Sequence, residues 1–305
     1  MKIAVMGAGA LGCYFGGRLA RSGADIAFVA RGAQLKALRR DGLRIESPLG
    51  DDHIAPVTAT DDPEEIGPVD TILFLVKLYD TEAAARRIAP MLGAETAVVS
   101  FQNGIDPWDR IAVVVGPGHV VGGTAVIPAD IRAPGIVRHN GPFARLTFGE
   151  FDGRKSARCE ALCAALEHAG VEAEVVPDIE VKIWEKFLVL SALAAATALT
   201  RLSIGPILAD PLGRDLFRAA IRESHAVGRA ACPALGEDAA DRAFALASDF
   251  PPGMRASMLD DLERGKRLEL DGLSGAVVRL GREHDIETPT HAVVQAALHP
   301  YVDGA

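Results

Sequence analysis

The sequence has few cysteines, no excess of basic residues and no clustered histidines. The four cysteines are Cys13, Cys159, Cys163 and Cys232, and they lack the close pairs typical of a zinc site or a redox dithiol. Lys and Arg number 32 against 41 Asp and Glu, a net charge of −9 that argues against a general nucleic-acid binder. His139, His225 and His291 show no metal-ligand spacing. We therefore expect a cytoplasmic protein of a reducing compartment, with no metal and no nucleic-acid partner.

Long apolar stretches are also scarce. The run Phe187–Leu199 is too short to span a bilayer and suits a buried helix. The apolar start at Ile3–Met6 breaks into glycines at once, and no basic segment precedes it as in a signal peptide. We expect no membrane association. The apolar helix is expected to serve either the core or a dimer contact.

In the first half of the chain, short β-rich runs alternate with helical stretches. The runs are apolar on both faces, which indicates a parallel sheet covered by helices on each side. The expected strands are Lys2–Met6, Ile26–Ala30, Thr71–Val76, Ala97–Phe101, Val120–Ala125 and Ala173–Val176. The expected helices are Leu11–Ser22, Ala33–Asp41, Thr81–Met91, Asp106–Val114 and Arg158–Ala169. A hairpin of Ile136–His139 with Arg145–Phe148 is expected around Asn140-Gly141-Pro142.

The pattern changes near Pro177 and is helical almost throughout from Ile179 onward. The expected helices are Ile179–Leu199, Pro211–Cys232, Glu237–Ala247, Arg255–Arg264, Gly272–Glu283 and Thr290–Leu298. A chain of 305 residues is long enough for two domains. We expect an α/β fold class, with a doubly wound sheet at residues 1–176 and an all-helical domain at residues 177–305.

A glycine-rich loop follows the first expected strand and opens the first expected helix. Gly7 permits a tight turn, Gly9 lets the backbone approach a pyrophosphate, and Gly12 allows close packing of helix and strand. The free N–H groups of the helix N-terminus favour phosphate. This context predicts a Rossmann-type dinucleotide site. The residues of the loop are Gly7, Ala8, Gly9, Ala10, Leu11 and Gly12.

The end of the second strand bears on the choice between NAD and NADP. An acidic residue there would hold the ribose 2′-hydroxyl, but this chain has Arg31, whose guanidinium suits a 2′-phosphate. We therefore expect NADP, although a solvated arginine would look the same in sequence. Lys77 and Asn103 follow the next two strands, at the sheet edge where ligands bind.

The motifs together resemble the ketopantoate reductase (2-dehydropantoate 2-reductase) family, within the 6-phosphogluconate-dehydrogenase-like group. They occur in family order over nearly the whole chain. The matching segments are Gly7–Gly12, Arg31, Val76-Lys77, Gln102-Asn103-Gly104, Arg138–Gly141, Ile183-Trp184-Glu185-Lys186, Ser257-Met258 and Glu269. The resemblance implies NADPH-dependent reduction of a 2-oxo acid in pantothenate biosynthesis, with the helical domain binding the substrate. Homodimers are common in this fold group, so a homodimer is compatible with it.

The resemblance also implies the roles of individual residues. Lys186 is the expected general acid, which stabilises and protonates the alkoxide that hydride transfer creates. Ser257 is expected to hold the substrate carboxylate, and Glu269 to face both cofactor and substrate. Asn103 is expected between nicotinamide and substrate, and the backbone near Ile127 along the cofactor groove.

The chain departs from the family pattern at three positions. Where the family has asparagines one and two turns after the lysine and just before Gly205, this chain has Leu190, Ala194 and Ile204. An apolar wall cannot recognise a substrate hydroxyl, and it is expected to lower the pKa of Lys186 by desolvation.

Three alternatives to ketopantoate reduction therefore stay open. The first is a more apolar 2-oxo acid or ketone as substrate. The second is a β-hydroxyacid or opine-type dehydrogenase, although the spacing from Ser257 to Glu269 favours the ketopantoate reductase type. The third is an NADP-binding regulator without turnover.

Overall fold

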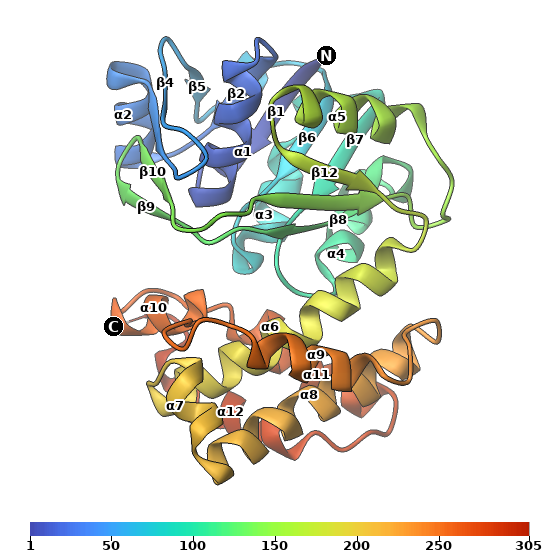
Figure 1. Ribbon diagram of the computed structural model, residues 1–305. Helices are drawn as coiled ribbons and strands as arrows, with labels where there is room; N and C mark the ends of the chain where they lie inside the picture. The colour runs from blue at the N-terminus through green and yellow to red at the C-terminus, as the bar shows by residue number, and fades with distance from the viewer. Residues whose placement is uncertain (305) are drawn as a thin grey trace. The chain divides into compact units, whose positions relative to one another are not determined.

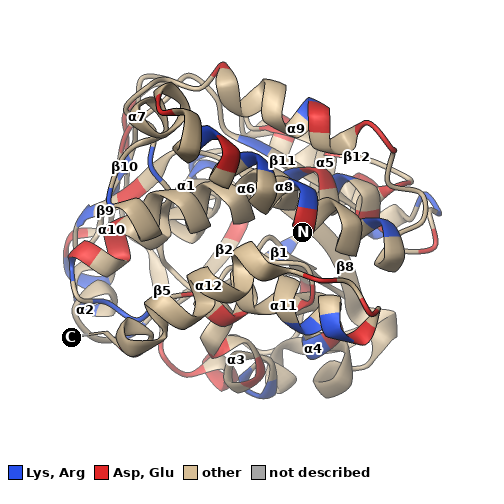
Figure 2. Cartoon of the chain, turned by 90° about the horizontal axis from the view of Figure 1, so that it is seen from below, with Lys and Arg blue, Asp and Glu red and all other residues tan. Residues whose placement is uncertain are grey.

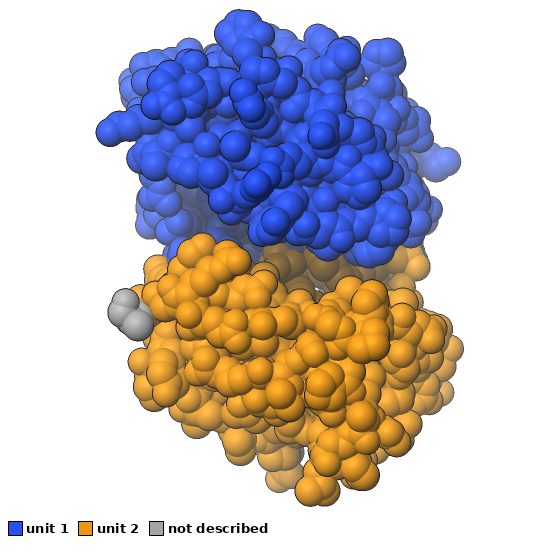
Figure 3. Space-filling view, turned by 60° about the vertical axis from the view of Figure 1, so that its left-hand side comes forward, with its two compact units in different colours: residues 1–102, 107–179 blue, residues 103–106, 180–305 orange. Residues whose placement is uncertain are grey.

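The computed structural model describes residues 1–304, which form two compact units (Figure 3). The first unit comprises Met1–Gln102 and Pro107–Ile179. The second comprises Asn103–Asp106 and the described residues from Glu180 onward. The short segment 103–106 therefore belongs with the helical unit, although strands of the first unit precede and follow it.

The first unit alternates strands and helices along the chain. Its strands are β1 (Lys2–Met6), β2 (Asp25–Val29), β3 (Leu43–Glu46), β4 (Asp52–Ile54), β5 (Thr58–Thr60), β6 (Val69–Phe74), β7 (Leu92–Ser100), β8 (Val120–Val126), β9 (Ala129–Ala133), β10 (Ile136–His139), β11 (Arg145–Gly149) and β12 (Glu172–Val175). Its α-helices are α1 (Ala10–Arg21), α2 (Gly32–Asp41), α3 (Thr81–Arg87), α4 (Pro107–Val115) and α5 (Ala157–His168). The predicted α/β class is confirmed.

The main sheet has the strand order β12-β11-β8-β7-β6-β1-β2-β5. The strands from β8 to β5 are parallel, whereas β11 is antiparallel to β8, so the sheet is mixed rather than wholly parallel as expected. The chain leaves β1 toward β2 on one side and later continues from β6 to β7 on the other. Right-handed crossovers therefore place α1 and α3 on opposite faces of the sheet. In agreement, α1 packs beside α5 and α3 beside α4 (Figure 1).

The central strands are buried on both faces. Ile3, Val5 and Leu73 have no exposed surface, and Phe28 is almost fully buried beneath α1. Apolar runs of this kind cannot lie at a solvated sheet face, because each buried side chain contributes about 1.5–3 kcal/mol only when water is excluded. The reversal of strand order at β1 and β6 puts the loop after β1 at the point where open α/β sheets bind ligands.

A second sheet, of order β4-β3-β10-β9, corrects the expected hairpin. β10 pairs with β9 and β3, whereas β11 joins β8 in the main sheet. The true tight connection is Pro134-Gly135 between β9 and β10, with Gly135 at φ 78°. The prediction was wrong because β9 is only half-buried and has no apolar alternation to mark it. The Pro-Gly dipeptide was the available signal.

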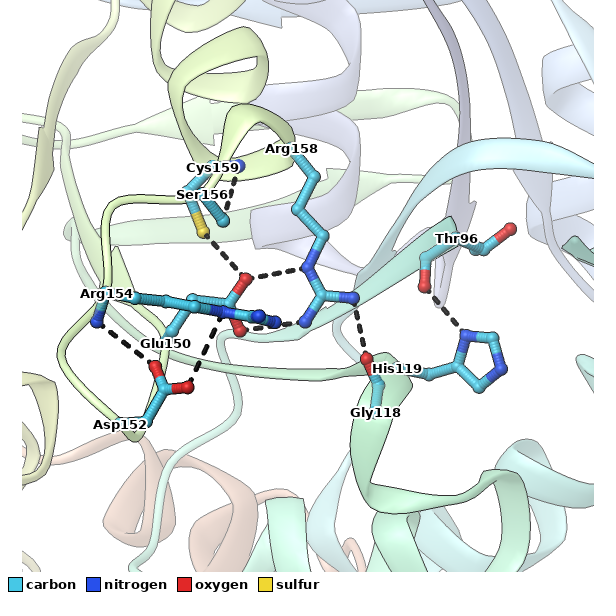
Figure 4. Close-up of polar contacts among 9 residues, drawn as sticks. All are labelled: Thr96, Gly118, His119, Glu150, Asp152, Arg154, Ser156, Arg158 and Cys159. Atoms are coloured by element: carbon cyan, nitrogen blue, oxygen red, sulfur yellow. Dashed lines mark hydrogen bonds and ion pairs between the residues drawn. The ribbon is translucent and has the colours of Figure 1, made fainter. Parts of the chain in front are cut away.

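A buried ion pair fastens the start of α5 to the loop after β11 (Figure 4). Arg158 donates from Nε and Nη2 to the two carboxylate oxygens of Glu150, at 2.7 and 2.8 Å, and from Nη1 to Gly118 O at 2.7 Å. Burial would raise the pKa of Glu150, but hydrogen bonds from Arg158 and Ser156 outweigh it, and the pKa lies below its usual value. Ser156 Oγ also accepts from Cys159 N as the cap of α5.

The second unit is helical. Its helices are α6 (Ile179–Thr200), α7 (Ile204–Ala209), α8 (Pro211–Ala231), α9 (Ala239–Ser248), α10 (Ser257–Glu263), α11 (Ser274–Glu283) and α12 (Pro289–Leu298). Helix α7 was not predicted, because Gly205-Pro206 lies within its six residues and indicates a break in a helical pattern. Acidic and basic residues are interspersed along these helices (Figure 2).

Helix α6 was predicted as Ile179–Leu199 and ends one residue later, so it is longer than the apolar run Phe187–Leu199 within it. By length and composition it could cross a membrane, yet 72% of its apolar window is buried within the protein. Ala192, Ala195 and Ala198 lie at or below 1% exposure. The helix is therefore mainly a buried core element, one of the two roles that the sequence left open.

Candidate active site

The loop between β1 and α1 requires glycine at two positions, because other backbone atoms lie too close there to leave room for a side chain. Gly7 has φ 106°, and a Cβ there would lie 2.8 Å from the Leu75 carbonyl carbon and from Val76 N. A Cβ at Gly12 would lie 2.1 Å from Gly7 O. Neither position therefore tolerates a side chain, and the loop folds tightly between the ends of β1 and β6.

Gly9 has the opposite environment. Nothing lies within 4 Å of the position its Cβ would take, so the loop is open at this point. Gly9 is also the N-cap of α1, and no side chain caps this end of the helix. The first-turn N–H groups around Ala10 and Leu11 thus point into open space with the positive end of the helix dipole, as a pyrophosphate requires. This loop fits a dinucleotide.

Arg31 stands at the N-cap of α2, directly after β2 and Ala30. Its side chain is 72% exposed, and Nη2 lies 3.0 Å from Asp80 Oδ2. The guanidinium is accessible to a 2′-phosphate, but a carboxylate already shares it. An exposed pair of this kind contributes little to stability, so the main effect of Asp80 is to offset the positive charge of Arg31.

The carboxyl ends of β6 and β7 are joined by Gln102, a buried residue whose role the sequence did not indicate. Its Nε2 donates to Val76 O and Thr81 Oγ1, both at 2.9 Å, and its Oε1 accepts from Ser100 Oγ at 3.1 Å. Gln102 therefore fixes the backbone immediately before Lys77 and Asn103.

Two further predicted cofactor residues lie in the first unit. Lys77 is the N-cap of a short 3₁₀ helix, Leu78–Asp80, and is half-buried. Ile127 follows β8 and packs partly against the core of the first unit.

In the second unit, Lys186 lies about two turns into α6, and its sequence neighbours Ile183 and Phe187 are buried. Its Nζ donates a hydrogen bond of 3.1 Å to Asn103 Oδ1. Because a lysine only donates, the amide must present its oxygen here, and the Nδ2 group points elsewhere. Within residues 1–304, that Nδ2 group makes no hydrogen bond, so it remains a donor for a ligand.

Burial lowers the pKa of Lys186 to about 8, and the charge of Glu269 opposes this shift. The direction expected from the sequence is confirmed. Glu269 is itself 7% exposed and immediately precedes the 3₁₀ turn Leu270–Gly272. Lys186, Asn103 and Glu269 therefore form one group, and a lysine of this pKa can both give and accept a proton near neutral pH.

Ser257 is not brought into that group by any described contact. It is the exposed first residue of α10, and no hydrogen bond of its hydroxyl occurs in the described part of the chain. The three apolar replacements also differ in position. Leu190, one turn after Lys186, is half-buried, whereas Ala194 and Ile204 are each 1% exposed. Of the three replacements, only Leu190 is partly exposed, and it lies on the same side of α6 as Lys186.

The strand order and the open N-terminus of α1 place the chain in the class of Rossmann-type dinucleotide-binding proteins. Residues 3–153 match the family Ketopantoate reductase PanE/ApbA, and residues 178–302 match Ketopantoate reductase PanE/ApbA C terminal. The chain belongs to this family, whose enzymes bind 2-oxo acids and a nicotinamide cofactor.

Similar proteins cover nearly the whole chain. A 2-dehydropantoate 2-reductase of Mesorhizobium japonicum is 36% identical, with 98% of this chain and 97% of that protein covered. The crystal structure of a PanE/ApbA family ketopantoate reductase from Ralstonia eutropha has a TM-score of 0.90 at 32% identity, covering 99% and 98% of the two chains. D-mandelate dehydrogenase, in a ternary structure with NADH and anilino(oxo)acetate, shares the fold, with a TM-score of 0.90 at 22% identity and the same coverage.

Proposed function

We propose that the protein reduces a 2-oxo acid to a 2-hydroxy acid with NADPH. In this proposal residues 1–176 bind the dinucleotide and residues 177–305 bind the substrate. The observation that carries it is the hydrogen bond between Lys186 and Asn103, with a lysine pKa of about 8. An ammonium so placed is acidic enough to be a proton donor and basic enough to be recharged at neutral pH.

The residues of the second unit would handle charge and the proton. The bound cofactor supplies the hydride to the carbonyl carbon. Lys186 Nζ donates to the substrate's carbonyl oxygen and transfers its proton as the alkoxide forms. Asn103 Oδ1 orients the ammonium, and its Nδ2 group remains to bind substrate or nicotinamide. Glu269 keeps the lysine charged and accepts hydrogen bonds from cofactor or substrate hydroxyls.

The residues proposed to bind the cofactor belong to the first unit. The segment Gly7–Gly12 would bind the pyrophosphate, and Arg31 the 2′-phosphate of NADPH. Lys77 and Ile127 would line the rest of the cofactor site. NADH is the competing cofactor, because Asp80 shares the Arg31 guanidinium and because D-mandelate dehydrogenase was solved with NADH.

The substrate is the finer part of the proposal. Ser257 would hold the 2-oxo acid's carboxylate. Ketopantoate carries a hydroxyl that a polar partner near the lysine would recognise, but Leu190 presents a hydrocarbon surface there. Leu190 therefore favours a 2-oxo acid with an apolar substituent, and D-mandelate dehydrogenase binds an aromatic compound, anilino(oxo)acetate. Membership of pantothenate biosynthesis depends on this point.

The test is NADPH and NADH oxidation with ketopantoate, 2-oxoisovalerate, phenylpyruvate and phenylglyoxylate. We expect NADPH turnover with at least one of them, and Lys186→Ala to reduce it by about 10²–10⁴-fold. Lys182→Ala is the control, since that lysine lies one turn earlier and pairs with Glu185. Full turnover by Lys186→Ala would refute the proton-donor role, and cofactor binding without any turnover would favour a regulator.

A cytoplasmic location and a homodimer are also proposed. The location is supported by four free thiols, three of them buried. Analytical ultracentrifugation tests the oligomeric state.

A further inference from the structure

The loop that carries Asn103 is held at its other end by an ion pair. Asp106, the last residue of the segment 103–106, accepts a hydrogen bond of 2.5 Å at Oδ2 from Arg279 Nη2. Between the two ends, Gly104 has φ 95°, a conformation that other residues rarely adopt. Asn103 at the start of the same segment accepts from Lys186. The four-residue loop is therefore attached to the helical unit at both ends.

Arg279 is held in place by a second ion pair and by the buried helix that carries it. Its Nη1 lies 3.3 Å from Glu283, one turn later on α11. Helix α11 is anchored by Val277 and Val278, which are 0% and 4% exposed. The guanidinium thus projects from a fixed backbone, which limits the side-chain entropy lost in holding Asp106.

The same stretch of chain also carries Glu269. The 3₁₀ turn Leu270–Gly272 follows Glu269 and leads directly into α11, so residues 269–279 form one continuous packed segment. At one end this segment places a carboxylate near Lys186, and at the other it holds Asp106. The segment 269–279 therefore contributes to the position of both Asn103 and Glu269, the two residues that act on the Lys186 ammonium.

We propose that Arg279 is a positioning residue, whose ion pair with Asp106 restrains the loop 103–106 and so holds the Asn103 amide at the Lys186 ammonium. The inference rests on the proposed role of Lys186 as proton donor. Arg279 is 46% exposed and Asp106 22% exposed, and a pair at that depth contributes little to global stability. A misplacement of about 1 Å at a reacting group, however, can cost about 100-fold in rate.

The variants are Arg279→Gln, Arg279→Lys and, as the matched control, Arg282→Gln. Arg282 is exposed near the end of the same helix and has no ion pair in the part of the chain that the structure describes. We expect Arg279→Gln to lower kcat about 10-fold or more with little change in Tm. Arg279→Lys should recover part of this loss, because lysine keeps the charge but lacks the planar guanidinium that reaches both Asp106 and Glu283. Arg282→Gln should match the wild type in both measurements.

Two further measurements separate positioning from a general structural effect. Amide hydrogen exchange should increase in the peptide containing residues 103–106 in Arg279→Gln, but not in Arg282→Gln. In an Asn103→Ala background, Arg279→Gln should have no additional effect on kcat, because the group it positions is gone.

Unchanged exchange at residues 103–106 would overturn the restraint. Faster exchange with an unchanged kcat, or with kcat losses that add fully to those of Asn103→Ala, would overturn the positioning role. Failure of the proposed function is recognised separately, by full turnover in Lys186→Ala. The exchange measurement needs no turnover, so it tests whether Arg279 restrains residues 103–106 even if the proposed function is wrong.

Discussion

Lys186 Nζ lies 3.1 Å from Asn103 Oδ1, although the two residues are 83 positions apart in the chain. The contact brings the loop after β7 to the first turns of α6. It converts a lysine on an apolar helix into an oriented donor.

Reduction should depend on the protonated form of Lys186. Burial lowers its pKa to about 8, so kcat/KM for 2-oxo acid reduction should be constant below that pH and fall above it. Oxidation of the 2-hydroxy acid needs the neutral amine and should rise through the same pH. Initial rates in both directions between pH 6 and 10 measure this, and parallel profiles would contradict the assignment.

Glu269→Gln should move the alkaline limb of the reduction profile to lower pH. The Glu269 charge raises the lysine pKa against the effect of burial, so removing that charge leaves the ammonium more acidic. Glu263→Gln is the control, because Glu263, the last residue of α10, pairs with Arg255 instead. A profile that stays in place in Glu269→Gln would show that the carboxylate does not act on Lys186.

Leu190→Asn should shift substrate preference toward ketopantoate. An amide one turn after Lys186 can bind a substrate hydroxyl, and it removes apolar surface from a hydrophobic substituent. We expect the ratio of kcat/KM for ketopantoate over phenylglyoxylate to rise by about 10- to 100-fold. Leu202→Asn, at a leucine 46% exposed just beyond α6, should leave the ratio unchanged.

Asp80→Asn should increase the preference for NADPH over NADH. The carboxylate pairs with Arg31 and competes with a 2′-phosphate for the guanidinium. Arg31→Ala should have the opposite effect and reduce NADPH affinity by about 1–3 kcal/mol, the range for a lost charged hydrogen bond. Dissociation constants of both cofactors, measured by fluorescence titration, give the two ratios.

Arg158→Ala should destabilise the first unit by about 2–3 kcal/mol, because it leaves the Glu150 carboxylate, whose side chain is 5% exposed, without its partner. Arg154→Ala, at a side chain 62% exposed, is the control. The pKa of Glu150 is lowered on folding, so its contribution is present above the unfolded pKa and is lost as pH falls. Denaturant unfolding at pH 7 and pH 4 should therefore show a smaller difference between Arg158→Ala and the wild type at pH 4.

The elements that local patterns determine were predicted well. β1 was predicted with its true bounds, and the long helices α6 and α8 to within one residue. The hairpin around Asn140 failed because strand pairing is a long-range choice. Both β10 and β11 carry a strand pattern, but only the tertiary fold assigns them to different sheets.

The candidate site divides in the same way. The residue types and their order determined the glycine loop, the arginine after β2 and the lysine near the start of α6, because those signals lie within a few residues of each other. Which groups meet the lysine was decided by tertiary structure: Asn103 and Glu269 approach it, and Leu190 alone of the three apolar replacements keeps exposed surface. The contact of Arg279 with Asp106 has no local signature at all. Distances between residues far apart in the chain depend on how whole helices pack, and no short pattern carries that information.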